Sequence, residues 1–198
     1  MKYKRLALLV GRGSRVPRIL ESVKSISNIN IVLVLSCIGN GIGISRAREN
    51  GINTGVLEWS NYKNKAGGRE IFTGNVRRML DDSGVDFVIM AGWRVLMPES
   101  FVKAYAGRIV NVHPSLLPKY RGDGDRAIEE QWRNRHEDLK AGCTVHFVDE
   151  GMDTGAIISQ FEIDSIGFDS VEELAEAIHK KEDLLLAGCI KLISEGKI

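Results

Sequence analysis

The sequence has almost no net charge, few cysteines and no long hydrophobic run. Its 27 Lys and Arg residues are balanced by 26 Asp and Glu residues, which leaves a formal net charge of +1. A nearly neutral chain has no overall field that would attract nucleic acid or an anionic membrane. Any anion that binds must therefore be held by a local group of residues.

The scarcity of cysteine excludes a disulfide framework. Cys37, Cys143 and Cys189 are widely spaced and odd in number, and they form no metal-binding pattern. No apolar run reaches the roughly 18 residues of a membrane span, and the run before Gly11 is too short for a signal sequence. We expect a soluble, cytoplasmic protein without a metal, whose cysteines are reduced and buried.

The remaining composition is typical of one hydrophobic core. The chain has 198 residues, of which 43% are hydrophobic and 27% are charged, so we expect residues 1–198 to form a single domain. Short apolar runs alternate with helical patterns as far as His113. This order predicts an α/β fold, a Rossmann-like and mostly parallel twisted sheet with helices on both faces. Ligands bind such sheets at the carboxyl ends of the strands, where Gly11, Gly92 and His113 are expected.

The first predicted strand opens onto a glycine-containing loop. Gly11, Gly13 and Ser14 follow this strand, and backbone amides at such a junction can converge on an anion. The dinucleotide-binding fingerprint requires a third glycine where Val16 stands and an acidic residue after the next strand, where Ser36 and Cys37 stand. A nicotinamide cofactor is therefore not expected.

The apolar run at residues 108–113 ends in two polar side chains. Asn111 and His113 are two residues apart, so on a strand they point to the same side. An amide donor beside an imidazole can stabilise an oxyanion and move a proton. A buried Asn and His that only satisfy the backbone at the end of the strand fit the same pattern.

Two longer motifs carry a resemblance to a known family. The motifs are Asn-Val-His-Pro-Ser-Leu-Leu-Pro-Lys-Tyr-Arg-Gly at 111–122 and Thr-Val-His-Phe-Val-Asp-Glu-Gly-Met-Asp-Thr-Gly at 144–155. Together they resemble the signature of the folate-dependent formyltransferases, and the resemblance extends over nearly the whole chain. It is strongest to the members that act on glycinamide ribonucleotide in purine biosynthesis. The resemblance implies 10-formyltetrahydrofolate as cosubstrate, small molecules rather than nucleic acid or membrane as partners, and a monomer or homodimer.

The resemblance also implies roles for individual residues. The catalytic group would be Asn111, His113 and Asp153. The substrate phosphate would be held by Gly11, Gly13, Ser14 and Arg15. The folate would be held by Arg94, Val95, Leu96, Val148, Asp149 and Gly151, although the family has one more residue between the glycine and Arg94. Glu182 would face the amine of the acceptor.

Several of these positions have a second interpretation. Arg15 stands where the family has Asn, and it fits either a phosphate contact or a solvated helix face. Glu182 fits an exposed helix face equally well. Asp123 and Asp125 stand where the family usually has a small residue and a His, and we interpret them as a helix cap and partners of the helix dipole rather than as partners of a cationic acceptor.

Three other histidines are not predicted to be catalytic. His146 is expected to be packed or to support the site from behind, His136 to be exposed, and His179 to lie on a helix.

The alternative functions differ in the acceptor or lack chemistry altogether. They are transfer to another amine, such as an amino-sugar nucleotide or methionyl-tRNA, hydrolysis of formyltetrahydrofolate, and a non-catalytic module that binds a phosphate or nucleotide.

Overall fold

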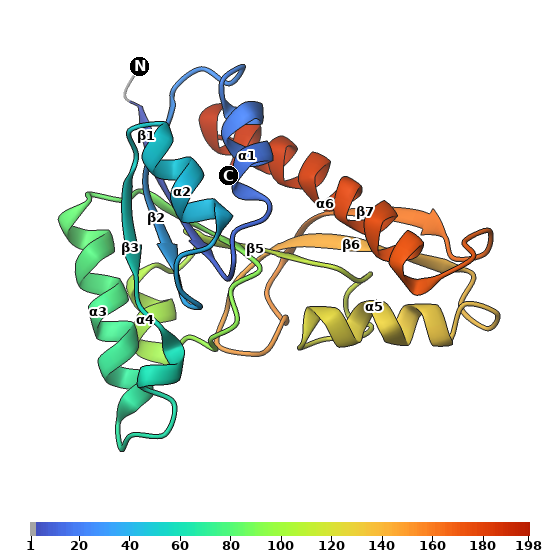
Figure 1. Cartoon of the computed structure of the whole chain (residues 1–198). Helices are drawn as coiled ribbons and strands as arrows, with labels where there is room; N and C mark the ends of the chain where they lie inside the picture. Colours follow the sequence, from blue (N-terminus) through green and yellow to red (C-terminus); the bar gives the residue numbers. More distant parts are fainter. Residues whose placement is uncertain (1–2) are drawn as a thin grey trace.

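The strands form one sheet in the order β3-β2-β1-β4-β5-β6-β7 (Figure 1). The structure is a computed structural model that describes residues 3–198. The strands are β1 (Lys4–Val10), β2 (Ile29–Ser36), β3 (Asn53–Val56), β4 (Phe87–Ala91), β5 (Ile109–His113), β6 (Lys140–Phe147) and β7 (Ile157–Asp164). The first five are parallel, whereas β6 and β7 are antiparallel to their neighbours. The predicted mostly parallel sheet is confirmed.

Six helices connect or cover these strands in the described part of the chain. They are α1 (Val16–Val23), α2 (Ile42–Glu49), α3 (Gly68–Asp82), α4 (Glu99–Ala104), α5 (Gly124–Arg133) and α6 (Val171–Ser194), and a 3-10 turn covers Trp59–Asn61. The alternation of strands and helices that was predicted as far as His113 is present. No described helix is long and apolar enough to cross a membrane.

The helices cover both faces of the sheet, as the continuous apolar run of β1 requires. The helices α1, α2 and α6 lie on one face, and α3 and α4 lie on the other (Figure 1). Leu8 packs in a cluster with residues of the first three helices, whereas Leu9 packs with residues of α3 and α4. Both side chains are fully buried. A strand covered on both faces is apolar throughout, because successive side chains point in opposite directions.

The loop after β1 is held close to the start of α2. Gly13 has a φ of +73°, and a Cβ atom there would lie 2.7 Å from the Cα atom of Gly43. Glycine at both positions therefore allows the two backbones to meet. The glycines from Gly39 to Gly43 run through the bend before α2 into its first turn, and the contact at Gly43 fixes the position of the loop at Gly11–Arg15.

The starts of α5 and α6 are capped by side chains. Asp123 is the N-cap of α5, and its Oδ1 accepts hydrogen bonds from the amides of Asp125 and Arg126. Ser170 caps α6 by accepting from the amide of Glu173, while the Glu173 carboxylate accepts from the amide of Asp169. The capping interpretation of Asp123 is confirmed, and it orients α5 beside the ends of β4 and β5.

Candidate active site

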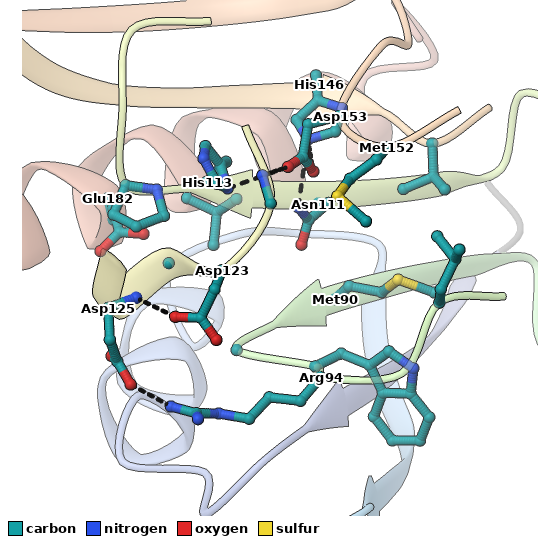
Figure 2. A pocket seen from close by; sticks show the side chains of 18 of the residues that line it. Met90, Arg94, Asn111, His113, Asp123, Asp125, His146, Met152, Asp153 and Glu182 are labelled. Carbon is teal, nitrogen blue, oxygen red and sulfur yellow. Dashed lines mark hydrogen bonds and ion pairs between the residues drawn. The ribbon is translucent and has the colours of Figure 1, made fainter. Parts of the chain in front are cut away.

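A cavity of about 350 Å³ lies at the carboxyl ends of β4 and β5. Its walls are the loop after β4, the end of β5, the start of α5, the loop after β6, and one turn of α6 (Figure 2). A cavity thus lies where the site was predicted, at the carboxyl ends of the parallel strands. Asn111, His113 and Asp153 all line it.

β5 delivers Asn111 and His113 to the same wall, and Asp153 approaches them from the loop after β6 (Figure 2). Asp153 adopts a φ of 52°, a left-handed conformation that Asp tolerates better than most residues. Its Oδ2 lies 3.5 Å from Nδ1 of His113 and accepts a hydrogen bond of 2.8 Å from the amide of Gly122. Gly122 ends the first motif, so the two motifs meet at this carboxylate.

Both ring nitrogens of His113 have partners. Nε2 lies 2.7 Å from the carbonyl oxygen of Tyr120, which can only accept, so Nε2 carries a hydrogen. Nδ1 faces the carboxylate of Asp153. The ring is only 3% exposed. The carbonyl of Tyr120 and the carboxylate of Asp153 therefore hold the ring in a fixed orientation beside the cavity.

Asp153 is held in its ionised form. Burial by itself would raise the pKa of this carboxyl, but His146, the charge of His113 and the Gly122 amide together outweigh burial and lower it. The carboxylate is therefore a fixed negative charge between two imidazoles.

His146 completes the group, and its position was not fully predicted from the sequence. It is 1% exposed, and its Nε2 lies 3.2 Å from Nδ2 of Asn111 and 3.6 Å from Oδ1 of Asp153. Nδ1 faces the carbonyl of Phe147 at 2.8 Å and so carries a hydrogen, while Nε2 faces both the Asn111 amide and the Asp153 carboxylate. His146 thus orients the amide of Asn111. The antiparallel pairing of Asn111 with His146 across β5 and β6 brings them together.

A charged cluster closes one end of the cavity beyond His113. Glu182 is 1% exposed, so the interpretation as an exposed helix face is wrong. Its Oε2 forms an ion pair with Nη2 of Arg15 and lies 2.7 Å from Nδ1 of His179. Burial, and after it the charge of Glu182, raises the pKa of the Cys143 thiol to about 12. His179, which was expected only as a helix residue, lines the cavity.

The predicted phosphate residues divide into two groups. Arg15 lines the cavity, and its pairing with Glu182 excludes the solvated helix face. Gly11, Gly13 and Ser14 lie beside the cavity rather than in its lining. Ser36 donates a hydrogen bond of 2.7 Å to the carbonyl of Gly11 and so fixes the start of the loop.

The predicted folate residues gather at the opposite side. Arg94, Val95, Leu96, Val148 and Gly151 line the cavity. Asp149 does not: its Oδ1 accepts from the amide of Gly151 and from Oγ1 of Thr154, which folds the turn before Asp153.

A salt bridge joins this wall to the start of α5. Arg94 Nη2 lies 2.6 Å from Oδ2 of Asp125, which connects the loop after β4 to α5 (Figure 2). The hydrogen bond and charge of Asp125 raise the pKa of Arg94. Within residues 3–198 there is no group of three or more His, Cys, Asp or Glu residues arranged to hold a metal ion.

An amide, an imidazole and a carboxylate in a cavity at the strand ends of a Rossmann-like sheet define an α/β enzyme with an acid–base site. The sequence profile of one such family, described as formyl transferase, matches residues 4–190. The chain belongs to the formyl transferase family.

The chain is similar to proteins of purine biosynthesis. It is 34% identical over 199 residues to the trifunctional purine biosynthetic protein adenosine-3 of Drosophila melanogaster, and 30% identical over 205 residues to the Homo sapiens protein of the same name. These matches include 98% and 100% of this chain but 14% and 19% of the relatives. The chain thus spans less than a fifth of the length of these relatives.

Solved structures resemble the chain over its full length. Phosphoribosylglycinamide formyltransferase from Anaplasma phagocytophilum superposes with a TM-score of 0.86 at 30% identity, covering 100% of this chain and 89% of that one. The protein of the same name from Campylobacter jejuni gives 0.84 at 32% identity, with 96% and 97% covered.

Proposed function

We propose that this chain transfers the formyl group of 10-formyltetrahydrofolate to the amine of glycinamide ribonucleotide. The observation that carries the proposal is the meeting of Asn111, His113 and Asp153 in one cavity of a formyl transferase fold. The names of the similar structures support glycinamide ribonucleotide as the acceptor. The cavity also has an arginine at one end and an apolar-lined loop at the other, which fits two different substrates.

In the reaction the acceptor amine attacks the formyl carbon, and the carbonyl electron pair moves onto oxygen. Asn111 donates an N–H to this oxyanion from an amide that is held 3.2 Å from Nε2 of His146. The imidazole of His113 lies beside the same oxygen. The oxygen then re-forms the carbonyl as the bond to the folate nitrogen breaks.

One proton must travel from the amine to the departing folate nitrogen. Asp153 orients His113 and holds a water molecule that relays this proton. Its low pKa keeps it ionised throughout, so it acts by position and charge. The attacking amine is itself the nucleophile, so the proposed reaction uses no Ser or Cys for that step.

The two substrates are assigned to opposite ends of the cavity. The folate lies against Arg94, Val95 and Leu96 on one side and the segment 148–151 on the other. The phosphate of the acceptor lies at the loop formed by Gly11, Gly13, Ser14 and Arg15, where the amides of Ser14 and Arg15 make no hydrogen bond within the described residues. Glu182 faces the amine region of the acceptor.

A labelling experiment tests the proposal. The protein is incubated with 10-formyltetrahydrofolate labelled with carbon-13 in the formyl group, together with glycinamide ribonucleotide, and the products are identified by mass spectrometry. We expect the label in the ribonucleotide. Label found in formate would instead identify a hydrolase, and label retained by the folate with every amine tried would leave only a binding module.

A further inference from the structure

The ion pair between Arg15 and Glu182 joins the loop before α1 to the middle of α6 at the closed end of the cavity. The Glu182 carboxylate is fully buried, and the Arg15 side chain is 13% exposed. Both residues line the cavity, as does His179. The pair therefore lies where an acceptor would have to bind.

The hydrogen bonds in this cluster cannot all be made at once. Nδ1 of His179 lies 2.9 Å from Nη2 of Arg15 and 2.7 Å from Oε2 of Glu182. One ring nitrogen either accepts from the guanidinium or donates to the carboxylate, but not both. One contact is therefore always unfavourable.

The second oxygen of the same carboxylate lacks a partner. Oε1 of Glu182 is buried and makes no hydrogen bond within residues 3–198. A buried charged oxygen without a donor is costly, and a ligand that supplies an N–H or O–H would remove that cost. The cluster is thus incomplete without a ligand.

A neighbouring pair shows a contrasting arrangement. Nε of Arg18, one turn along α1, lies 3.0 Å from Oδ2 of Asp183 on α6. Arg18 is exposed, whereas the Asp183 side chain is 15% exposed and both of its oxygens are buried without a hydrogen bond in the described part of the chain; neither residue lines the cavity. One ion pair to α6 thus lies inside the cavity and one outside it, and the outer pair provides a control for a buried carboxylate that no ligand in the cavity can reach.

We propose that the Arg15–Glu182 pair makes the site select a ligand that carries both a phosphate monoester and a hydrogen-bond donor. The proposal rests on the proposed function, because it explains how the acceptor is recognised. A phosphate that takes the Arg15 guanidinium must separate it from Glu182, which leaves the buried carboxylate unpaired. A donor group on the same ligand then satisfies that carboxylate. A ligand that carries only the phosphate or only the donor separates Arg15 from Glu182 and leaves one of these two residues without a partner.

Binding of two fragments to the whole protein tests this coupling. Methyl phosphate carries only the anionic group and glycinamide only the donor group. Their dissociation constants are measured by NMR titration, each alone and in the presence of the other at saturation. For the unaltered protein we expect glycinamide to tighten methyl phosphate binding by about tenfold.

The Glu182→Gln variant gives the more diagnostic result. We expect it to bind methyl phosphate about tenfold more tightly than the unaltered protein, because Arg15 is released, and to lose the coupling to glycinamide. Asp183→Asn makes the same change at the next residue of α6, which does not line the cavity, and should leave the dissociation constant within about twofold. On an Arg15→Asn background, Glu182→Gln should give no tightening.

The proposal is overturned if folded Glu182→Gln protein binds methyl phosphate no more tightly than the unaltered protein. It is also overturned if Asp183→Asn, or Glu182→Gln on the Arg15→Asn background, gives the same gain, since a general loss of negative charge would then explain it. No formyl donor is present in these titrations. If the coupling is observed but no formyl group is transferred, only the assignment of the acceptor is overturned. If formyl transfer is observed without the coupling, the proposed selection by the Arg15–Glu182 pair is overturned.

Discussion

Asp153 lies between two imidazoles, and this position has a consequence for stability against pH. Its pKa is lower in the folded protein than in the unfolded chain, so the ionised carboxylate stabilises the fold. That contribution is complete above the unfolded-state pKa of about 4 and is lost as the pH falls through the folded-state value.

We therefore expect the free energy of unfolding of Asp153→Asn to differ from that of the unaltered protein by a constant amount at neutral pH. The difference should shrink once the pH falls below about 4. Urea unfolding at a series of pH values measures it. A difference that stays the same from pH 6 to pH 3 would show that the Asp153 carboxylate is not selectively stabilised by the fold.

Asn111 is expected to act on the reaction rather than on the fold. Asn111→Ala removes the proposed oxyanion donor and should lower kcat by about 10² to 10³, with little change in KM for either substrate. Its melting temperature should stay close to that of Asn30→Ala, an exposed strand residue outside the cavity. A collapse of the melting temperature in Asn111→Ala alone would favour the structural interpretation of this residue.

The residues of the site were predictable where a local motif carried them. Asn111 and His113 share a strand face, so their meeting follows from the sequence. The positions of His146 and His179 do not, because they depend on the antiparallel pairing of β5 with β6 and on the approach of α1 to α6. A sequence read one segment at a time contains no signal for such contacts.

Two aspartates at the start of α5 should differ in their effect on stability. Asp123 caps the helix, and Asp123→Ala should cost about 1 kcal/mol of unfolding free energy. Asp125 pairs with Arg94 through side chains that are 71% and 56% exposed, so Asp125→Ala should cost less, about 0.5 kcal/mol. Urea unfolding compares the two. A larger loss for Asp125→Ala would mean that the salt bridge, rather than the cap, holds α5 in place.

The last helix could be predicted from local sequence patterns, but the burial of Glu182 within it could not. The apolar spacing after Ser170 and the capping box of Ser170 with Glu173 are typical of a helix start, and the structure has α6 at Val171–Ser194. The burial of Glu182 was not predictable in the same way, because a carboxylate in a helical pattern is usually exposed. Only the placement of Arg15 opposite Glu182 makes its burial possible.

On the scale of the whole molecule, the interior strand β1 is enclosed by helices on both faces. Leu8 and Leu9 are both fully buried, one against each layer. We expect Leu8→Ala and Leu9→Ala each to cost about 2 to 5 kcal/mol of unfolding free energy. Denaturant unfolding of the two variants measures this. If one variant lost almost nothing, the corresponding face would not be covered as described.

The sheet order was only partly predictable from the sequence. The alternation of strands and helices indicated a parallel sheet, and the apolar run of β1 indicated a strand covered on both faces. The change to antiparallel β6 and β7 depends on long-range pairing rather than on a local pattern. The prediction of a single domain at 1–198, that of a monomer or homodimer and that of a cytoplasmic location all remain predictions.

The most direct test of the proposed function is the rate of tetrahydrofolate formation from 10-formyltetrahydrofolate, with and without glycinamide ribonucleotide, with Asp153→Asn as the blank. We expect turnover only when the ribonucleotide is present, and almost none in the variant. Equal turnover without the ribonucleotide, or full activity of Asp153→Asn, would contradict formyl transfer through the site formed by Asn111, His113 and Asp153.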